Sequence, residues 1–243
     1  MACRTLFISD LHLDESAPPI TNALLQFLKQ EARGCDALYI LGDLFEAWIG
    51  DDDDQTLNSV VSDALRELVD TGCAVYLMHG NRDFLLGEAF CLRAGASLIT
   101  DPTVIELYGT KTLLMHGDSL CTSDTEYMAF RKQMRNPAIQ ADLLAKPLAE
   151  RRAIANQLRS QSREAMSNKA EDIMDVTPSE VARQMELAGV ERLIHGHTHR
   201  PATHVSNDGS LQGTRIVLGD WGAKLWFLAA TEEGCELIER QLN

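Results

Sequence analysis

The chain reads Thr5-Leu6-Phe7-Ile8-Ser9-Asp10-Leu11-His12 near its start, so a short apolar run leads directly into two metal-ligand residue types. Such a run predicts a buried strand over Thr5–Ile8. Four later segments repeat this feature: Leu41-Gly42-Asp43, His79-Gly80-Asn81-Arg82-Asp83, Met115-His116-Gly117-Asp118 and His195-Gly196-His197-Thr198-His199. Because strands of one sheet can bring their ends to one edge, we expect all five segments to meet in one pocket.

The remaining pattern predicts a mixed α/β (α+β) fold. Further strands are predicted over Ala37–Leu41, Ala74–Met78, Leu113–Met115 and Leu193–Ile194, and helices over Ile20–Glu31 and Thr56–Thr71. After Ala202 the sequence becomes β-rich, with strands predicted over Ala202–Val205, Thr214–Leu218, Leu225–Ala229 and Glu236–Glu239. The length of 243 residues suits a single domain over residues 1–243.

Residues from about 122 to 170 differ from the rest of the chain. They carry little strand signal and predict several helices, broken at Pro137 and Pro147. Nine Lys and Arg against five Asp and Glu give this stretch a net charge of +4, whereas the whole chain carries −14. We predict a helical lid inserted into the domain. The acidic run Asp51–Asp54 is predicted to be a solvated loop without a catalytic role.

Composition excludes several classes of protein. Hydrophobic residues make up 45% of the chain, which is enough for a full core. The net charge of −14 argues against a nucleic-acid partner, which would favour a basic surface. Six scattered cysteines without a C-x-x-C pair indicate reduced thiols, and we see neither a signal peptide nor an apolar run of membrane-spanning length. We therefore expect a cytoplasmic protein, and a monomer because no self-association signal stands out.

The residue types at the strand ends suit a pair of metal ions. Taken singly, Asp43 and Asn81 also fit turns, and His116 fits a core. Together, imidazoles and carboxylates can hold two cations about 3.5–4 Å apart when one carboxylate bridges them. Asp43 is the expected bridge, because it lies between the other ligand groups in the chain. A ligand set without cysteine suits Mn²⁺, Fe²⁺ or Zn²⁺. Glycines beside the ligands allow close backbone approach.

This ordered set resembles the calcineurin-like metallophosphoesterase family, whose pattern is D-x-H, G-D, G-N-H-[DE], H and G-H-x-H. The resemblance covers nearly the whole chain and implies a β-sandwich flanked by helices. It also implies one metal on Asp10, His12, Asp43 and His199, and a second on Asp43, Asn81, His116 and His197. By position, His79, His195 and His204 are not expected to be ligands.

Arg82 departs from the family pattern, which has histidine at this position as proton donor to the leaving oxygen. Arginine cannot donate that proton, because its pKa lies above about 12. A phosphate leaving group, with a second pKa of about 6, departs without it. Arginine can also stabilise charge on phosphoryl oxygens through paired N–H donors. Arg82 therefore points to cleavage of a diphosphate rather than of an ordinary phosphoester, although a surface salt bridge is the alternative.

The longer motifs around these residues are similar to those of the UDP-2,3-diacylglucosamine pyrophosphatases. The resemblance implies Mn²⁺-dependent attack of water on the α-phosphorus, which gives UMP and 2,3-diacylglucosamine 1-phosphate (lipid X) in lipid A biosynthesis. It implies catalytic roles for Asp43, Asn81, Arg82 and His116. The implied substrate contacts are Asn81, Arg82, Asp124, Ser162, Lys169 and His197. A further contact position falls on Met166, where relatives carry a polar residue, so Met166 is either a contact or part of an acyl channel.

The predicted lid combines basic residues with apolar ones such as Leu143 and Leu144. That combination favours contact with anionic lipid on the cytoplasmic face of the inner membrane, although an ordinary solvated helical subdomain remains the alternative. Two other functions also remain open. One is a different dinuclear-metal phosphodiesterase or nucleotide phosphoesterase of the same fold, and the other is a scaffold without catalysis. Complete ligand positions argue against the scaffold.

Overall fold

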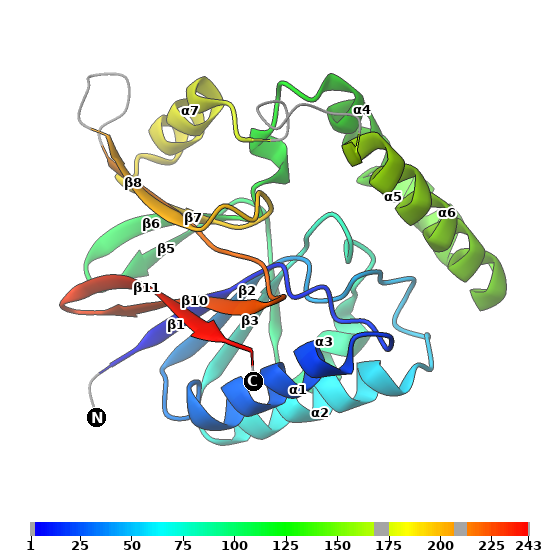
Figure 1. Cartoon of the computed structure of the whole chain (residues 1–243), viewed down its shortest axis with the longest axis horizontal. Coiled ribbons are helices and arrows are strands. Elements are labelled where there is room, and N and C mark those ends of the chain that lie inside the picture. The colour runs from blue at the N-terminus through cyan, green and yellow to red at the C-terminus, as the bar shows by residue number, and fades with distance from the viewer. Residues whose placement is uncertain (1–2, 168–174, 207–212, 243) are drawn as a thin grey trace.

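Two β-sheets packed face to face form the centre of the molecule in this computed structural model. The structure describes residues 3–167, 175–206 and 213–242, and of residues 163–167 and 206 it describes the backbone alone. The first sheet has the order β11-β10-β1-β2-β3-β4 and the second β5-β6-β7-β9-β8 (Figure 1). Their strands are β1 (Thr5–Ile8), β2 (Ala37–Leu41), β3 (Ala74–Met78), β4 (Ser97–Ile99), β5 (Thr103–Leu107), β6 (Thr110–Met115), β7 (Arg192–His195), β8 (Ala202–Ser206), β9 (Gly213–Val217), β10 (Lys224–Thr231) and β11 (Gly234–Gln241).

Helices cover the outer faces of both sheets. The first sheet is covered by α1 (Pro18–Gln30), α2 (Thr56–Asp70) and α3 (Glu88–Ala94), and the second by α7 (Pro178–Ala188) (Figure 1). Three apolar clusters fill the layers, because each sheet buries side chains on both faces. Leu24 and Leu65 pack under the first sheet, Phe7 and Ile194 lie between the sheets, and Met185 packs against the second.

Parallel pairing brings the carboxyl ends of the central strands to the same edge. β1, β2, β3 and β4 run parallel in the first sheet, and β6, β7 and β9 in the second. Alternation of β1–β3 with helices explains this, since a parallel pair needs a crossover connection. The α/β prediction and the two-sheet sandwich are both confirmed. Among the described residues, no helix has the length and apolar character needed to traverse a bilayer.

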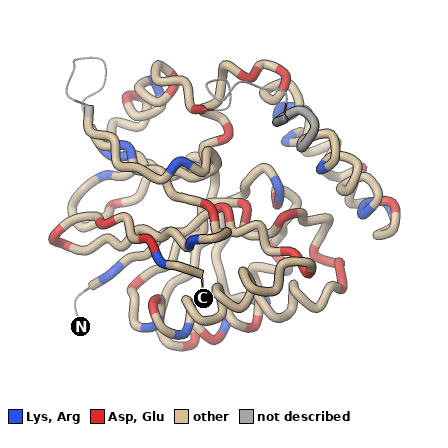
Figure 2. The backbone as a smooth tube through the Cα atoms, in the orientation of Figure 1, with Lys and Arg blue, Asp and Glu red and all other residues tan. Residues whose placement is uncertain are grey.

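Three helices occupy the stretch predicted as a lid and extend from the body as an arm, which we define as α4 (Thr125–Met134), α5 (Pro137–Leu144) and α6 (Leu148–Ser167) (Figure 1). Pro137 begins α5 and Pro147 precedes α6, so the predicted breaks are confirmed. None of the residues of α5 is buried. Basic residues recur along the arm in Figure 2.

The acidic run Asp51–Asp54 is only in part the solvated loop that the sequence predicts, because Asp52 and Asp54 are exposed whereas Asp51 and Asp53 are not. Asp51 accepts hydrogen bonds from Trp48 Nε1 and from the backbone N–H groups of Gly87 and Phe90, at 3.0, 2.9 and 3.0 Å. Asp53 is buried. The run is ordered by its partners in α3 and in the arm, and these partners lie too far away in sequence for a local pattern to reveal them.

Candidate metal centre

All seven predicted metal ligands lie just beyond the ends of five central strands. Asp10 and His12 follow β1, Asp43 follows β2 and Asn81 follows β3, in the first sheet. The others come from the second sheet, where His116 follows β6, and His197 and His199 follow β7. The backbone ties the two loops after β1 and β2 together, because His12 N donates to Asp43 O at 3.0 Å. Parallel strand ends thus gather residues that are up to 189 positions apart in sequence.

Five of these residues have a left-handed backbone conformation. Asp10, His12, Asp43, His197 and His199 have φ between 51° and 68°. Residues other than glycine rarely adopt this region, and when they do they cluster at functional sites. The conformation turns the chain sharply after β1, β2 and β7 and brings the side chains of these loops to the same edge of the sandwich. The sequence gives no signal for this strain.

The first group of ligand atoms contains Asp10, His12 and His199, whose ligand atoms all lie within 4.8 Å of one another. The Nε2 atoms of the two histidines are 3.3 Å apart, and His199 Nε2 lies 3.5 Å from Asp10 Oδ1. Asp10 Oδ2 accepts hydrogen bonds from Ser9 Oγ and His197 N, at 2.6 and 2.9 Å. Oδ1 is buried and has no hydrogen-bond partner among the described residues, which fits a metal ligand.

The second group contains Asp10, Asp43 and His116, so it shares Asp10 with the first, and Asp43 lies between the histidines of the two groups. Asp43 Oδ2 lies 3.8 Å from His116 Nε2 and 4.0 Å from His12 Nε2. Its other oxygen, Oδ1, accepts a hydrogen bond from Arg82 N at 2.8 Å, so Oδ2 is the atom available to both groups. Asn81 Oδ1 lies 3.0 Å from His116 Nε2 and 2.9 Å from His197 Nδ1. His116 thus lies beside both Asp43 and Asn81, and Asn81 also lies beside His197.

The surroundings fix the direction of these ligands. His116 Nδ1 lies 2.9 Å from Leu41 O and donates to that carbonyl, which turns Nε2 towards Asp43 and Asn81. Glycine is needed where the loops touch. A Cβ on Gly80 would lie 2.0 Å from Asp43 Oδ1, and one on Gly196 would lie 2.3 Å from Asp10 Oδ2. The predicted close approach of backbone to the site is confirmed at these two positions.

Burial and mutual charge shift the pKa values of these groups strongly. Burial raises the pKa of Asp43 to about 6 against the opposing effect of His116 and His12. Burial works to lower the pKa of His116, but Asp43 and Asp10 outweigh it and raise that pKa to about 9. Burial, with the nearby His116, lowers the pKa of His197 to about 4. Buried carboxylates and imidazoles that lie side by side and have pKa values shifted this far fit a site for divalent cations.

Neither Asp124 nor Ser162 belongs to these two groups. Asp124 caps the N-terminus of α4, where its carboxylate accepts a hydrogen bond from Tyr127 N at 3.0 Å. Ser162 is half-buried on α6. Met166 is on α6 but its side chain lies outside the described residues, as does the whole of Lys169. Their predicted contacts with substrate stay predictions.

The three histidines that were not expected to be ligands belong to neither group. His79 Nε2 lies 2.6 Å from Leu86 O, and His195 is buried between Gly196 O and Arg215 Nη1, at 2.9 and 3.2 Å. His204 is exposed on β8. Their contacts are with backbone and with the second sheet.

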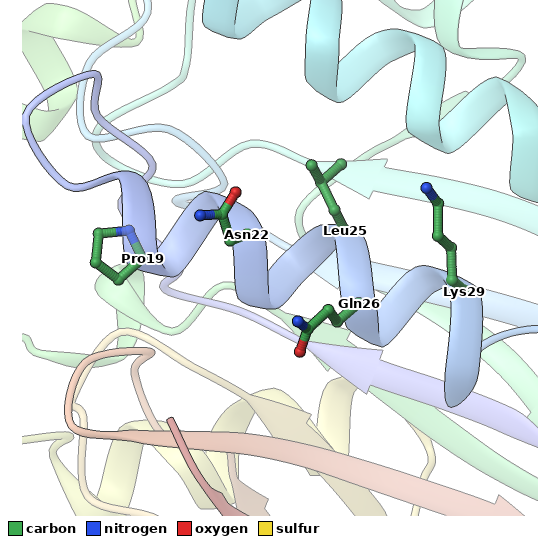
Figure 3. A pocket seen from close by; sticks show the side chains of 5 residues that line it. All are labelled: Pro19, Asn22, Leu25, Gln26 and Lys29. Atoms are coloured by element: carbon green, nitrogen blue, oxygen red, sulfur yellow. The ribbon is translucent and has the colours of Figure 1, made fainter. Parts of the chain in front are cut away.

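Several residues around the centre were missed by sequence reasoning. Glu46 Oε2 lies 3.1 Å from His12 Nδ1, and Asp220 Oδ2 lies 3.8 Å from His199 Nδ1. On the other side, the Tyr127 ring from the arm stacks against His197 with centroids 5.9 Å apart. Glu46 lies three residues after Asp43 in the sequence, and this closeness is the one sequence signal that could have found it. The hollow on α1 in Figure 3 belongs elsewhere, since Pro19, Asn22, Leu25, Gln26 and Lys29 line it.

Two groups of oxygen and imidazole nitrogen atoms overlap at Asp10 and lie on either side of Asp43, at the strand ends of a two-sheet sandwich. They define a metal-dependent phosphoesterase with a dinuclear centre. The sequence pattern of the calcineurin-like phosphoesterases matches residues 3–201, and the chain belongs to this family.

Relatives with similar sequences carry one name. The chain is 59% identical to the UDP-2,3-diacylglucosamine hydrolase of Cellvibrio japonicus over 96% of this chain and 97% of the relative. It is 58% identical to the protein of the same name from Marinobacter nauticus, over 94% and 93%. Among solved structures, an archaeal phosphodiesterase is 13% identical over 98% of this chain and 99% of that one, with a TM-score of 0.48.

Proposed function

We propose that the protein hydrolyses the diphosphate bond of UDP-2,3-diacylglucosamine in lipid A biosynthesis, by attack of water on the α-phosphorus. The products are UMP and 2,3-diacylglucosamine 1-phosphate. The names of two relatives at 58% and 59% identity support this substrate, and the dinuclear centre supports a phosphoryl transfer to water. One observation carries the choice of a diphosphate over a phosphoester, namely the place and surroundings of Arg82.

Arg82 lies at the shared carboxylate of the centre. Its backbone N–H donates to Asp43 Oδ1, and its side chain is 19% exposed. Its Nε atom is buried and lacks a hydrogen-bond partner among the described residues, so this donor is free for a phosphoryl oxygen. A guanidinium holds charge but delivers no proton. The residue therefore suits a leaving group that departs as a phosphate.

The residues of the centre divide into two sets that fit two cations. Asp10, His12, Asp43 and His199 would hold one, and Asp43, Asn81, His116 and His197 would hold the other. When bound, such cations lower the pKa of water and neutralise charge on phosphoryl oxygens. Mn²⁺ is the proposed metal, because amide, carboxylate and imidazole ligands without thiolate suit it. The remaining proposed contacts with substrate are Asp124, Ser162, Met166 and Lys169, together with Asn81, Arg82 and His197.

The deciding experiment is a Mn²⁺-dependent assay on UDP-2,3-diacylglucosamine with both products identified by mass. We expect UMP and the sugar 1-phosphate, and a product that retains a diphosphate would refute the proposed bond. A panel with nucleotide phosphodiesters and p-nitrophenyl phosphate tests the other phosphoesterase activities. Faster turnover of p-nitrophenyl phosphate than of the diphosphate would contradict the role given to Arg82.

We further propose that the arm contacts the anionic cytoplasmic face of the inner membrane and that the protein acts as a monomer. Phe130 on α4 and Leu144 on α5 are exposed apolar side chains, which supports contact with a lipid surface. The basic charge of the arm supports it less than the sequence implied, because several of its arginines pair with acidic groups of the body.

A further inference from the structure

Glu46 lies between three groups that come from different parts of the chain. Its Oε2 atom is 3.1 Å from His12 Nδ1, and its Oε1 atom is 2.9 Å from Arg159 Nη2 of the arm and 4.0 Å from Arg82 Nη1. The backbone holds it there, since Glu46 N donates to Leu13 O at 3.0 Å. A single carboxylate thus touches a candidate ligand, the arginine assigned to the diphosphate, and α6.

The contact with His12 decides which imidazole nitrogen faces the metal position. With Nδ1–H directed to Glu46, the lone pair of Nε2 remains free on the side of Asp43 and His199, where Nε2 lies 4.0 and 3.3 Å from their atoms. His12 Nδ1 and Glu46 Oε2 are at hydrogen-bond distance, but the angle at the Nδ1–H group is outside the range of a formed hydrogen bond. In the second group, His116 Nδ1 has the neutral Leu41 carbonyl instead.

The contact with Arg159 ties this carboxylate to the arm. Arg159 also lies 3.4 Å from Asp14 Oδ2, so its guanidinium spans two acidic side chains from the loops after β1 and β2. Glu46 and Arg159 are each about four-fifths buried, at 21% and 24% exposure, which limits screening by solvent. The position of Oε1 is therefore set by the arm, and the position of Oε2 sets the ring of His12.

We propose that Glu46 is a positioning residue that orients His12 and, through Arg159, makes cation affinity at the Asp10, His12 and His199 group depend on docking of the arm. The proposal deepens the proposed function, and it concerns metal binding before any substrate is present. Outer carboxylates of this kind change metal affinity by about 10- to 100-fold in other proteins.

Calorimetric titration of the metal-free full chain with Mn²⁺ tests the first half of the proposal. We expect Glu46→Gln to weaken one of two Mn²⁺ sites about tenfold or more. Glu46→Asp, which keeps the charge but shortens the side chain, should weaken the same site less. Glu180→Gln is the matched control, because it removes an equal charge from an ion pair with Arg183 within α7, outside the centre and the arm, and both affinities should stay within about twofold.

The identity of the weakened site is read from the electron paramagnetic resonance of bound Mn²⁺, with His12→Asn and His197→Asn as references. The spectrum of Glu46→Gln at limiting Mn²⁺ should match that of His12→Asn. A match to His197→Asn, or unchanged affinities in a folded Glu46→Gln protein, would overturn the proposal. Far-ultraviolet circular dichroism of each metal-free variant establishes folding, and Glu46→Asp decides the matter if Glu46→Gln does not fold.

Coupling to the arm is tested by a double-mutant cycle. Arg159→Met should weaken the same Mn²⁺ site in the wild-type background, and should add less than about twofold in the Glu46→Gln background. An equal effect in both backgrounds would mean that Arg159 acts on the Mn²⁺ site independently of Glu46, and the proposed coupling of the arm through Glu46 would then be wrong. Since the readout is Mn²⁺ binding, failure of the diphosphate assay would not decide it, and the two hypotheses fail separately.

Discussion

Gly80 illustrates how single residues determine the geometry of the candidate centre. An added Cβ would lie 2.0 Å from Asp43 Oδ1 and 2.3 Å from Asp43 N, so no side chain fits without moving the shared carboxylate. Backbone atoms cannot give way as a flexible side chain can. Asp83 strengthens this arrangement, because its carboxylate accepts hydrogen bonds from Gly80 N and Leu44 N, both at 2.8 Å.

We therefore expect Gly80→Ala to abolish high-affinity binding of the second Mn²⁺ and to reduce activity at least about 100-fold, as displacement of catalytic groups by about 1 Å does elsewhere. Calorimetric titration with Mn²⁺ and the diphosphate assay check this. Gly222→Ala is the control, since its Cβ would meet nothing closer than Asp220 Oδ2 at 3.8 Å. Normal metal binding in Gly80→Ala would show that the loop can move.

At the level of elements, the arm is held to the body by arginines of unequal burial. Arg151 is 5% exposed and donates from Nη1 to Ile49 O at 2.6 Å and from Nε to Lys146 O at 2.9 Å, while its guanidinium pairs with Asp52. Arg152, one residue later, is 42% exposed and pairs with Asp53 and Asp54. Only the buried arginine satisfies backbone carbonyls that would otherwise lack partners.

Arg151→Leu should cost about 2 kcal/mol of unfolding free energy, because it removes charged hydrogen bonds to buried carbonyls. It should also make the arm more sensitive to limited proteolysis. Arg152→Leu is the matched variant, and because Gln55 Nε2 still donates to the buried Asp53 and Arg152 itself is 42% exposed, its loss should be clearly smaller than that of Arg151→Leu. Urea denaturation and timed trypsin digestion of the three proteins check both expectations. Equal losses in the two variants would contradict the distinction.

Strands were predicted well from sequence wherever the apolar run was continuous. β1, β2 and β3 have the predicted bounds, because strands buried on both faces leave a clear signal. β4 was missed because it has three residues and is largely exposed, and α3 because it has seven. α7 could have been found, since Pro178 begins it and Gly189 ends it in the left-handed conformation.

The seven ligands were predicted as a set because each follows a strand whose end is fixed by the sheet. Glu46 and Asp220 were missed because a carboxylate behind a histidine has no sequence pattern of its own. The ion pairs between α6 and the acidic run join residues 98 to 99 positions apart, and spacing alone cannot reveal them.

At the scale of the whole molecule, the face of the first sheet that packs against the second carries an aromatic stack from β1, β2 and β3, whose central ring is Tyr39. Its ring lies 5.1 Å from that of Phe7 and 4.6 Å from that of Tyr76. Burial, with a smaller contribution from Tyr76, raises the pKa of Tyr39 to about 12 from an ordinary value of 10.0. Between these values the unfolded chain loses a proton that the folded protein keeps, so stability falls as the pH rises from about 10 towards 12.

Tyr39→Phe keeps the stacked ring and removes this titration. We expect its unfolding free energy to fall less than that of the wild type between about pH 9 and pH 11. Urea denaturation at both pH values, with tyrosinate absorbance recorded in parallel, checks the expectation. The other titrating groups are common to both proteins and cancel in the comparison. Parallel pH profiles would mean that Tyr39 ionises freely in the folded state.

Binding of the arm to a membrane is also a property of the whole molecule. We expect co-sedimentation with anionic vesicles at low salt, weakened at high salt. Because arginines such as Arg131 and Arg159 already face acidic groups of the body, apolar contacts should matter too. Phe130→Ser with Leu144→Ser should reduce binding, whereas Leu187→Ser, on the exposed face of α7, should not. Absence of binding by the wild type would end this proposal.

The left-handed conformations beside the strand ends position the ligands of the centre but lower the folding stability of the chain. Each such residue costs on the order of 1 kcal/mol relative to glycine, and the five together lower the folding stability of the whole chain. His199 is 38% exposed, so its replacement loses little packing. The metal-free His199→Gly protein should therefore melt at a higher temperature than the wild type while being inactive. A higher melting temperature would show that the backbone strain which positions the ligands makes the enzyme less heat-resistant than its fold allows.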